Sequence, residues 1–222
     1  MNVLITGANR GLGLGFVHHY LELGHQVWAC YRADYGALSD MQSESLHLIC
    51  WDVGTDGEPE GELPERIDLL INNAGIYGSG KDGQSLQNIT PKAMLEVFNI
   101  DCIGPLRVVQ KLAGRLAAAQ GIVANISSKM GSSEDNSSGG TYAYRAAKAG
   151  LVIVSKSMAV DLADHGVHVI TLHPGWVMTD MTGQTGLIDV HTSVNGMADV
   201  ISRAHNYSAG LFIAYDGNIV PY

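Results

Sequence analysis

Cysteine and basic residues are both scarce in this chain. Cys30, Cys50 and Cys102 lie far apart and form no CxxC pair, which argues against a disulfide framework or a zinc site and favours a reducing compartment. Lys and Arg number 13 against 22 Asp and Glu, which gives a formal net charge of −9. A net acidic chain is a poor general binder of nucleic acid or of an anionic membrane. We therefore expect neither partner, although a local basic site for a single phosphate is compatible with this charge.

Long apolar runs and targeting signals are also missing. No stretch of about 18 apolar residues occurs, so no membrane-spanning helix is expected. No basic region followed by an apolar region opens the chain, so we expect no secretory signal and a cytoplasmic location. The nine histidines are not grouped with carboxylates or cysteines that would complete a metal site. The 222 residues are 46% hydrophobic and 16% charged, which excludes a disordered chain and suits one domain, residues 1–222.

Short apolar runs alternate with helical patterns along the chain. Strand-like runs cover residues 3–5, 27–31, 46–51, 67–71, 122–126, 167–172 and 211–215. Helical spacing covers 12–23, 91–119 with a kink expected at Pro105, and 143–164, which Gly166 ends. Strands separated by helices predict a doubly wound α/β fold with a parallel sheet. Ligands are then expected at the C-terminal ends of the strands.

A glycine-rich turn joins the first strand to the first helix. Residues 6–13 read TGANRGLG, with a GxxxGxG spacing. Glycines permit a tight turn and close approach of the backbone to a pyrophosphate, and the helix N-terminus offers unpaired N–H groups. The turn predicts a dinucleotide site, and an ordinary βα loop is the alternative. The residues expected at the cofactor are Gly7, Asn9, Arg10, Gly11, Leu12 and Gly13. The GxxxGxG spacing resembles the short-chain dehydrogenase/reductase family.

The end of the second strand predicts the cofactor type. Dinucleotide sites place an acid there for a ribose 2′-hydroxyl, or a basic group for a 2′-phosphate. This chain carries Tyr31 and Arg32 at that point, and Arg10 could face the same pocket. Two guanidinium groups and no acid favour NADPH over NADH. NAD remains possible, because Arg32 could be a solvated loop residue and Asp34 could serve a ribose.

Further motifs match the family in order along the chain. The resemblance implies that Asp52 and Val53 contact the adenine, although Asp52 could equally cap a turn. Asn73, Ala74 and Gly75 belong to an NNAG motif (residues 72–75), where small residues permit close approach to the cofactor. Pro174 and Gly175 match a PG motif beside the nicotinamide, where the backbone of Val177 and the hydroxyl of Thr179 would bind the carboxamide.

Tyr144 and Lys148 are the strongest candidates for chemistry. Positions i and i+4 share one face of a helix, so these two side chains project together. A phenol has a pKa near 10, and an adjacent ammonium is expected to lower that pKa toward the operating pH of a general acid. Tyr142 is the rival, but its spacing from Lys148 places it off that face.

Two polar residues complete the predicted catalytic set. Ser127 and Ser128 follow the strand-like run over 122–126, so two hydroxyls stand at its C-terminal end. A hydroxyl there can hold a substrate carbonyl oxygen beside the phenol, and the family's serine matches Ser128. Asn99 lies in the preceding helix, where the resemblance implies an asparagine that holds a water linking Lys148 to solvent. A plain polar residue near the helix kink is the alternative.

The joint match covers most of the chain and implies a function. Stretches such as LHPGWVMTDM and the ending FIAYDGNIVPY resemble the C-factor-like and sniffer-type carbonyl reductases of the family. The resemblance implies a Rossmann fold with strand order 3-2-1-4-5-6-7, and an NADPH-dependent enzyme that interconverts a carbonyl and an alcohol on a small molecule. A dinucleotide-binding signalling protein with little turnover is the alternative. Self-association through the helices over 91–119 and 143–164, as a dimer or tetramer, is expected from the family.

Overall fold

Seven strands pair side by side into one sheet in the order β3-β2-β1-β4-β5-β6-β7, and every pair is parallel. The computed structural model describes all of residues 1–222. The strands are β1 (Asn2–Ile5), β2 (Gln26–Tyr31), β3 (Leu46–Cys50), β4 (Leu69–Asn72), β5 (Ile122–Ile126), β6 (His168–His173) and β7 (Phe212–Ala214). The predicted doubly wound sheet and its strand order are therefore confirmed.

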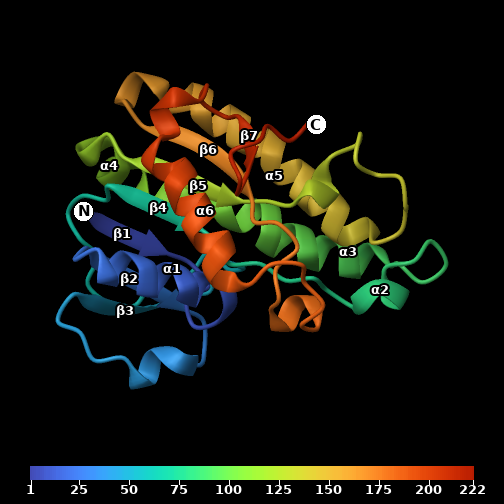
Figure 1. Cartoon of the computed structure of the whole chain (residues 1–222), viewed down its shortest axis with the longest axis horizontal. Helices are drawn as coiled ribbons and strands as arrows, with labels where there is room; N and C mark the ends of the chain where they lie inside the picture. Colours follow the sequence, from blue (N-terminus) through green and yellow to red (C-terminus); the bar gives the residue numbers. More distant parts are fainter.

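Helices cover both faces of the sheet (Figure 1). They are α1 (Gly11–Glu22), α2 (Gly80–Gly83), α3 (Pro91–Phe98), α4 (Gly104–Ala119), α5 (Tyr142–Asp161) and α6 (Val190–Ser202). One core, which includes Phe16 of α1 and Met197 of α6, lies under α1 and α6. The other, which includes Leu112 of α4 and Met158 of α5, lies on the opposite face. Burial on both faces explains why the strands are continuous apolar runs rather than alternating patterns.

The helical stretch over 91–119 is divided differently from the prediction. A π-helical turn, η2 (Asn99–Ile103), joins α3 to α4, and Pro105 lies in the first turn of α4. The N–H of Gly104 donates to the carbonyl of Asn99, so helical hydrogen bonding continues through the junction, and the wider turn comes directly before Pro105, which has no N–H to donate. The departure from α-helix thus precedes Pro105, and the wider π turn carries Asn99 and Asp101. A π turn inside a helix is often found at a functional site.

Helix α6 is an element that the sequence analysis did not predict. Asp189 caps its first turn by accepting from the N–H of Thr192 at 2.7 Å. It packs closely on α1, because a Cβ on Gly15 would lie 2.6 Å from Val190 Cγ1. None of the helices is both long and apolar enough to cross a membrane.

Candidate active site

The C-terminal ends of β1 and β4 meet where the strand order reverses, which is the position that binds ligands in open α/β sheets. Thr6 Oγ1 accepts from the N–H groups of Asn73 and Ala74, both at 3.0 Å. Asn73 Nδ2 donates to the carbonyls of Thr6 and Gly7, also at 3.0 Å. The glycine turn and the NNAG segment are therefore one hydrogen-bonded unit.

The glycine turn leaves room for no side chain at two of its positions. A Cβ on Gly13 would lie 2.2 Å from the carbonyl oxygen of Gly7, and one on Gly7 would lie 2.8 Å from Ala74 Cα. Gly7 and Gly11 also have φ of +62° and +55°, a region that favours glycine. Helix α1 begins after Arg10 with no side-chain cap and no acid in its first turn. Its first N–H groups are thus available to an anion, as a pyrophosphate site requires.

A cavity of about 550 Å³ opens beside this unit. It is lined by Arg10, Gly75, Ile76, Tyr77, Gly78, Ser79, Ala93, Glu96, Asp180 and Met181. Arg10 Nη1 lies 3.9 Å from Asp180 Oδ2, and both side chains are 72% exposed. An ion pair so exposed contributes little stability, so Arg10 is free to turn toward a phosphate. The cradle and the cavity together fit a dinucleotide.

Arg32 and Asp34 both lie exposed at the predicted ribose end. The exposed Arg32 follows β2, and its carbonyl accepts from the thiol of Cys50 at 3.3 Å. Asp34 Oδ1 accepts from the N–H of Gly36 at 2.9 Å and so closes its own turn. The side chain of Asn9 donates to the carbonyl of Asp34 at 3.0 Å. Asn9 therefore ties this turn to the glycine turn, while Leu12 packs against the core.

Asp52 and Val53 follow β3. Asp52 Oδ1 accepts from the N–H of Gly54 at 2.9 Å, which is the turn-capping role weighed against adenine binding. Val53 is buried, and its carbonyl accepts from Arg107. Contact with an adenine stays a prediction for both.

The segment over residues 174–189, between β6 and α6, holds the predicted nicotinamide residues and is called the flap below. The carbonyl of Pro174 accepts from the hydroxyl of Ser193 at 2.6 Å, and Gly175 has φ of +85°. Val177 pairs with Ile188, and its carbonyl accepts from Thr182. Thr179 caps the turn over Asp180–Thr182. Gly11 faces this flap, since a Cβ on it would lie 3.8 Å from Thr179 Cγ2.

Helix α5 and the end of β5 bring Ser128, Tyr144 and Lys148 together. Lys148 Nζ lies 5.5 Å from the centre of the Tyr144 ring and donates to the carbonyl of Ile126 at 3.1 Å. The neighbouring Ser127 donates to the carbonyl of Lys148 at 2.9 Å. Ser127 is thus occupied in joining β5 to α5, and the Ser128 hydroxyl faces the phenol. Tyr142, by contrast, is 38% exposed.

The pKa of Tyr144 is raised, whereas the sequence led us to expect that Lys148 would lower it. Burial raises the pKa of the phenol above its ordinary value, and Lys148 and the Ser128 hydroxyl only partly counteract that rise. A negative charge nearby, that of Asp101, raises the pKa further. Tyr144 is therefore a phenol at neutral pH, which suits a proton donor.

The residue that reaches Lys148 is Asp101 rather than Asn99. Asn99 Nδ2 donates to the carbonyl of Gly54 at 2.7 Å, and its Oδ1 accepts from Arg107 Nη2 at 3.2 Å. Those bonds fix the turn after β3 and leave the side chain with no contact to Lys148. Asp101 Oδ2 lies 3.2 Å from Lys148 Nζ. Asn99 and Asp101 both lie in the π turn, and the residue that contacts Lys148 is two positions after the one that the sequence suggested.

Gln84 is a second residue that the sequence analysis missed. It is fully buried, its Oε1 accepts from the N–H of Tyr144 at 2.9 Å, and its Nε2 donates to the carbonyl of Tyr77. Thr141 provides no side-chain cap for α5, so Gln84 supplies it from a distant loop. The Tyr77 ring lies 5.1 Å from that of Tyr144. The only sequence signal was the polar stretch over 78–89, which gave no reason to single out one residue.

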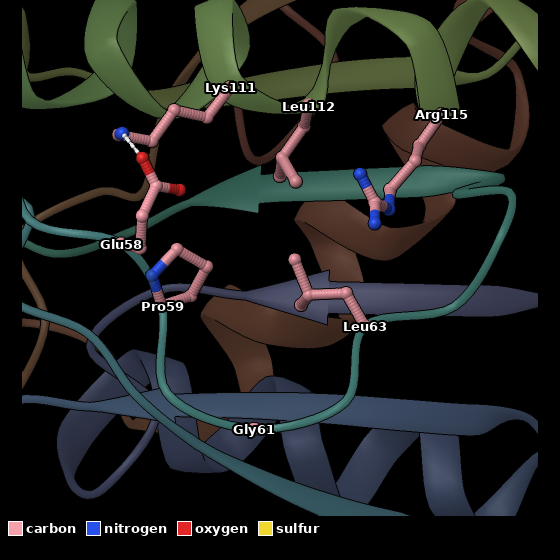
Figure 2. A pocket seen from close by; sticks show the side chains of 7 residues that line it. All are labelled: Glu58, Pro59, Gly61, Leu63, Lys111, Leu112 and Arg115. Atoms are coloured by element: carbon pink, nitrogen blue, oxygen red, sulfur yellow. Dashed lines mark hydrogen bonds and ion pairs between the residues drawn. The ribbon is translucent and has the colours of Figure 1, made fainter.

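A second cavity of about 240 Å³ lies between the segment over 58–63 and α4 (Figure 2). Lys111 and Glu58 form an ion pair at its side. None of the predicted site residues lines it, so it has no part in the site described above. No group of three or more His, Cys, Asp or Glu side chains is placed to hold a metal ion.

Comparisons with known proteins agree on one family. The family model described as "short chain dehydrogenase" matches residues 1–187. The C-signal of Myxococcus xanthus is 40% identical over 157 residues, which are 70% of this chain and 93% of that protein. The NADPH-bound carbonyl reductase from chicken fatty liver has a TM-score of 0.87 at 31% identity, covering 100% of this chain and 98% of that one. The carbonyl reductase Sniffer of D. melanogaster has a TM-score of 0.90 at 27% identity, covering 100% and 99%.

Proposed function

The chain belongs to the short-chain dehydrogenase family, and from this membership we propose that it reduces an aldehyde or ketone to an alcohol with NADPH. The similarity to C-signal and to Sniffer confirms the resemblance to the C-factor-like and sniffer-type members. The observation that carries the proposal is the meeting of Ser128, Tyr144 and Lys148 at the strand ends where the sheet order reverses.

Each of these side chains has a part in the proposed reaction. When bound, the cofactor supplies a hydride to the carbonyl carbon. Ser128 holds the carbonyl oxygen through its hydroxyl. Tyr144 donates its phenolic proton to that oxygen as the C=O π bond breaks, which completes the alcohol. Lys148 then faces the phenolate with its ammonium and stabilises it.

Two arginines support NADPH as the cofactor. Arg10 and Arg32 are exposed, and the nearby Asp34 is engaged in its own turn. Guanidinium groups recognise a phosphate through several charge-assisted hydrogen bonds. The similar chicken enzyme is described as NADPH-bound. We propose that the glycine turn and α1 N-terminus hold the pyrophosphate, while these arginines bind the 2′-phosphate; NAD(H) remains the weaker candidate.

The flap after β6 supports an apolar substrate. Trp176, Met178 and Met181 are 53%, 40% and 47% exposed. Met181 lines the cavity, and Trp176 and Met178 belong to the same segment. Exposed apolar side chains at a binding cavity are typical of a ligand site. An apolar aldehyde or ketone therefore suits this site better than a hydroxy acid.

A panel of carbonyl compounds tests the proposal. NADPH consumption is followed with aromatic and long-chain aldehydes and ketones, with Tyr144→Phe as the inactive control. NADPH affinity is measured separately by fluorescence or calorimetry. Turnover of an apolar carbonyl that Tyr144→Phe abolishes supports the reductase.

A dinucleotide-binding signalling protein is the second candidate, and the 40% identity to C-signal favours it. Tight NADPH binding without turnover of any carbonyl would select this reading. The Tyr144–Lys148 pair argues for the enzyme, because a protein that only binds a dinucleotide needs no proton donor.

Self-association and location stay predictions. Leu95, Ile103, Ile153 and Val160, on α3, η2 and α5, are 70%, 39%, 53% and 64% exposed. We propose that these side chains pack between copies of the chain, which light scattering of the purified protein would detect. All three cysteines are free, in keeping with the predicted reducing, cytoplasmic location.

A further inference from the structure

Asp101 forms the one ion pair of this chain in which both side chains are buried. Its side chain is 0% exposed and that of Lys148 is 6% exposed, whereas every other ion pair has an exposed member. Asp101 Oδ2 lies 3.2 Å from Lys148 Nζ, and Oδ1 accepts from the N–H of Ile76 at 2.8 Å. The carboxylate is therefore held at two points, one on the segment after β4 and one on α5.

The partners of Lys148 show what this contact does. Nζ donates to the carbonyl of Ile126, lies beside Asp101 and sits 5.5 Å from the Tyr144 ring. Burial is the largest single influence on the pKa of Lys148 and acts to lower it, but the charge and hydrogen bond of Asp101 together with Tyr144 and Cys102 outweigh burial, so the net shift is upward. Burial also raises the pKa of Asp101, whereas Lys148 and the N–H of Ile76 favour its carboxylate form. The ammonium and the carboxylate therefore depend on each other for their charges, and their contact holds Lys148 in place.

Lys148 and Asp101 both affect the pKa of Tyr144, in opposite directions. The titratable groups that act on it are Lys148, Asp101 and Tyr77, and Cys102 adjoins the pair. Lys148 alone would favour the phenolate, and Asp101 opposes that effect. A neutral amide in place of Asp101 would leave the ammonium uncompensated at the phenol.

We propose that Asp101 is a positioning residue that anchors Lys148 and offsets its charge, so that Tyr144 stays a phenol at neutral pH and the site favours carbonyl reduction over alcohol oxidation. This inference rests on the proposed function and adds its direction. Reduction needs a protonated Tyr144, whereas oxidation needs the phenolate as base. Compensation of Lys148 therefore moves the oxidation reaction to more alkaline pH and preserves reduction.

The first experiment compares pH profiles in both directions. Asp101→Asn keeps the size of the side chain and removes its charge. We expect the pH dependence of alcohol oxidation to shift to lower pH by at least about one unit, which is the effect of a unit charge a few ångströms away in a protein interior. The pH above which reduction loses activity should fall by the same amount, because Tyr144 would lose its proton at a lower pH. Asp199→Asn, which removes an exposed carboxylate paired with Arg203, should leave both profiles unchanged.

The outcomes separate positioning from plain structural support. A fall in kcat without any shift of either profile would overturn the proposal, because a structural role lowers activity at every pH alike. A shift to higher pH would overturn it as well.

A second measurement needs neither turnover nor an altered Asp101. The absorbance of phenolate is titrated in the unmodified protein and in Tyr144→Phe, and the difference reports Tyr144 alone. We expect ionisation above the ordinary phenol pKa of about 10. Ionisation of Tyr144 near neutral pH would overturn the inference. This titration can refute the inference even where Asp101→Asn does not fold, since removing one member of a buried pair leaves an uncompensated charge. It also distinguishes the two proposals, because it holds or fails whether or not any carbonyl is reduced.

Discussion

Gln84 Oε1 accepts a hydrogen bond from the backbone N–H of Tyr144 at 2.9 Å, across 60 residues of chain. The first N–H groups of a helix have no partner within the helix, and here a buried amide from the loop over 78–89 supplies one. The same side chain donates to the carbonyl of Tyr77. The loop therefore fixes the start of α5, and with it the position of the phenol.

Replacement of this amide should affect stability and turnover together. Gln84→Ala leaves a buried N–H and a buried carbonyl without partners, at a cost of about 1–3 kcal/mol of unfolding free energy. We expect kcat to fall, because Tyr144 loses its fixed position, while NADPH affinity changes little. Chemical denaturation and steady-state kinetics measure the two effects. The exposed Gln87→Ala is the matched control, and equal effects of both variants would contradict the role of Gln84.

Tyr144→Phe tests the proton donor directly. The change removes one hydroxyl, so the fold and NADPH affinity should survive, whereas kcat should fall by about 10²–10⁴-fold, the usual contribution of general acid catalysis. Tyr142→Phe, on the exposed side of the same helix turn, should be mild. The helical-face argument is wrong if the two variants exchange these results.

Arg32→Asp tests the choice of cofactor. Loss of a guanidinium and repulsion by a carboxylate should weaken NADPH binding by roughly 2–4 kcal/mol. NADH has no 2′-phosphate and should be affected little. Calorimetric titration with both cofactors gives the difference, with Arg203→Asp, directly after α6, as the control. Equal losses for NADPH and NADH would count against a 2′-phosphate site.

His173 predicts a loss of stability in acid. Burial, with help from Lys129, lowers its pKa from 6.5 to about 4, and its Nδ1 accepts from the N–H of Lys129 at 3.2 Å. Between these two pH values the unfolded chain binds a proton that the folded chain does not, so stability is present above pH 6.5 and is lost as the pH falls toward 4. The loss reaches roughly 3 kcal/mol, from about 1.4 kcal/mol for each unit of pKa.

Comparison with His173→Asn isolates this effect. The Asn oxygen can accept from Lys129 but does not titrate, so the acid-dependent part of the stability should shrink in the variant. Urea denaturation at pH values between 4 and 7 provides the measurement. An unchanged pH dependence would show that other groups are responsible.

The loop over 131–141 is predicted to be mobile without substrate and to close over the site. Its residues 133–139 are exposed, and Arg145 tethers it by donating to the carbonyl of Met130 at 3.1 Å and to Ser138 Oγ at 2.9 Å. Segments with few apolar contacts open easily. Hydrogen exchange in residues 133–139 should be fast in the free and NADPH-bound protein and slower with a substrate analogue. Arg145→Ala should accelerate it further, and strong protection in the free protein would indicate a rigid wall.

Most strands and the proximity of Tyr144 to Lys148 could be predicted because their signals are local. Each strand is a short apolar run, and the sheet buries both of its faces. Tyr144 and Lys148 are four residues apart on one helix, so their common face follows from helix geometry alone. The tight glycine turn likewise follows from the spacing of Gly7, Gly11 and Gly13 within one short segment.

Helix α6 escaped prediction because its stability comes from packing. Its sequence, VHTSVNGMADVIS, is rich in residues of modest helix propensity and contains Gly196. A Cβ on Gly196 would lie 2.4 Å from the carbonyl oxygen of Tyr215, and Gly15 of α1 accommodates Val190 and Val194. Gly196 thus weakens the helical signal of α6 in the sequence and permits its close contact with Tyr215 in the fold.

The amino-acid sequence by itself thus determined the sheet, the glycine cradle and the Tyr144–Lys148 pair, each of which follows from a periodicity within one segment. Only the tertiary structure decided that Asp101 reaches Lys148, that Asn99 turns toward Gly54 and Arg107, and that Gln84 caps α5. These contacts join segments far apart in the chain. Whether the amide Asn99 or the acid Asp101 of the π turn meets Lys148 depends on how α3, η2 and α5 pack against one another, and no spacing along the chain encodes that geometry.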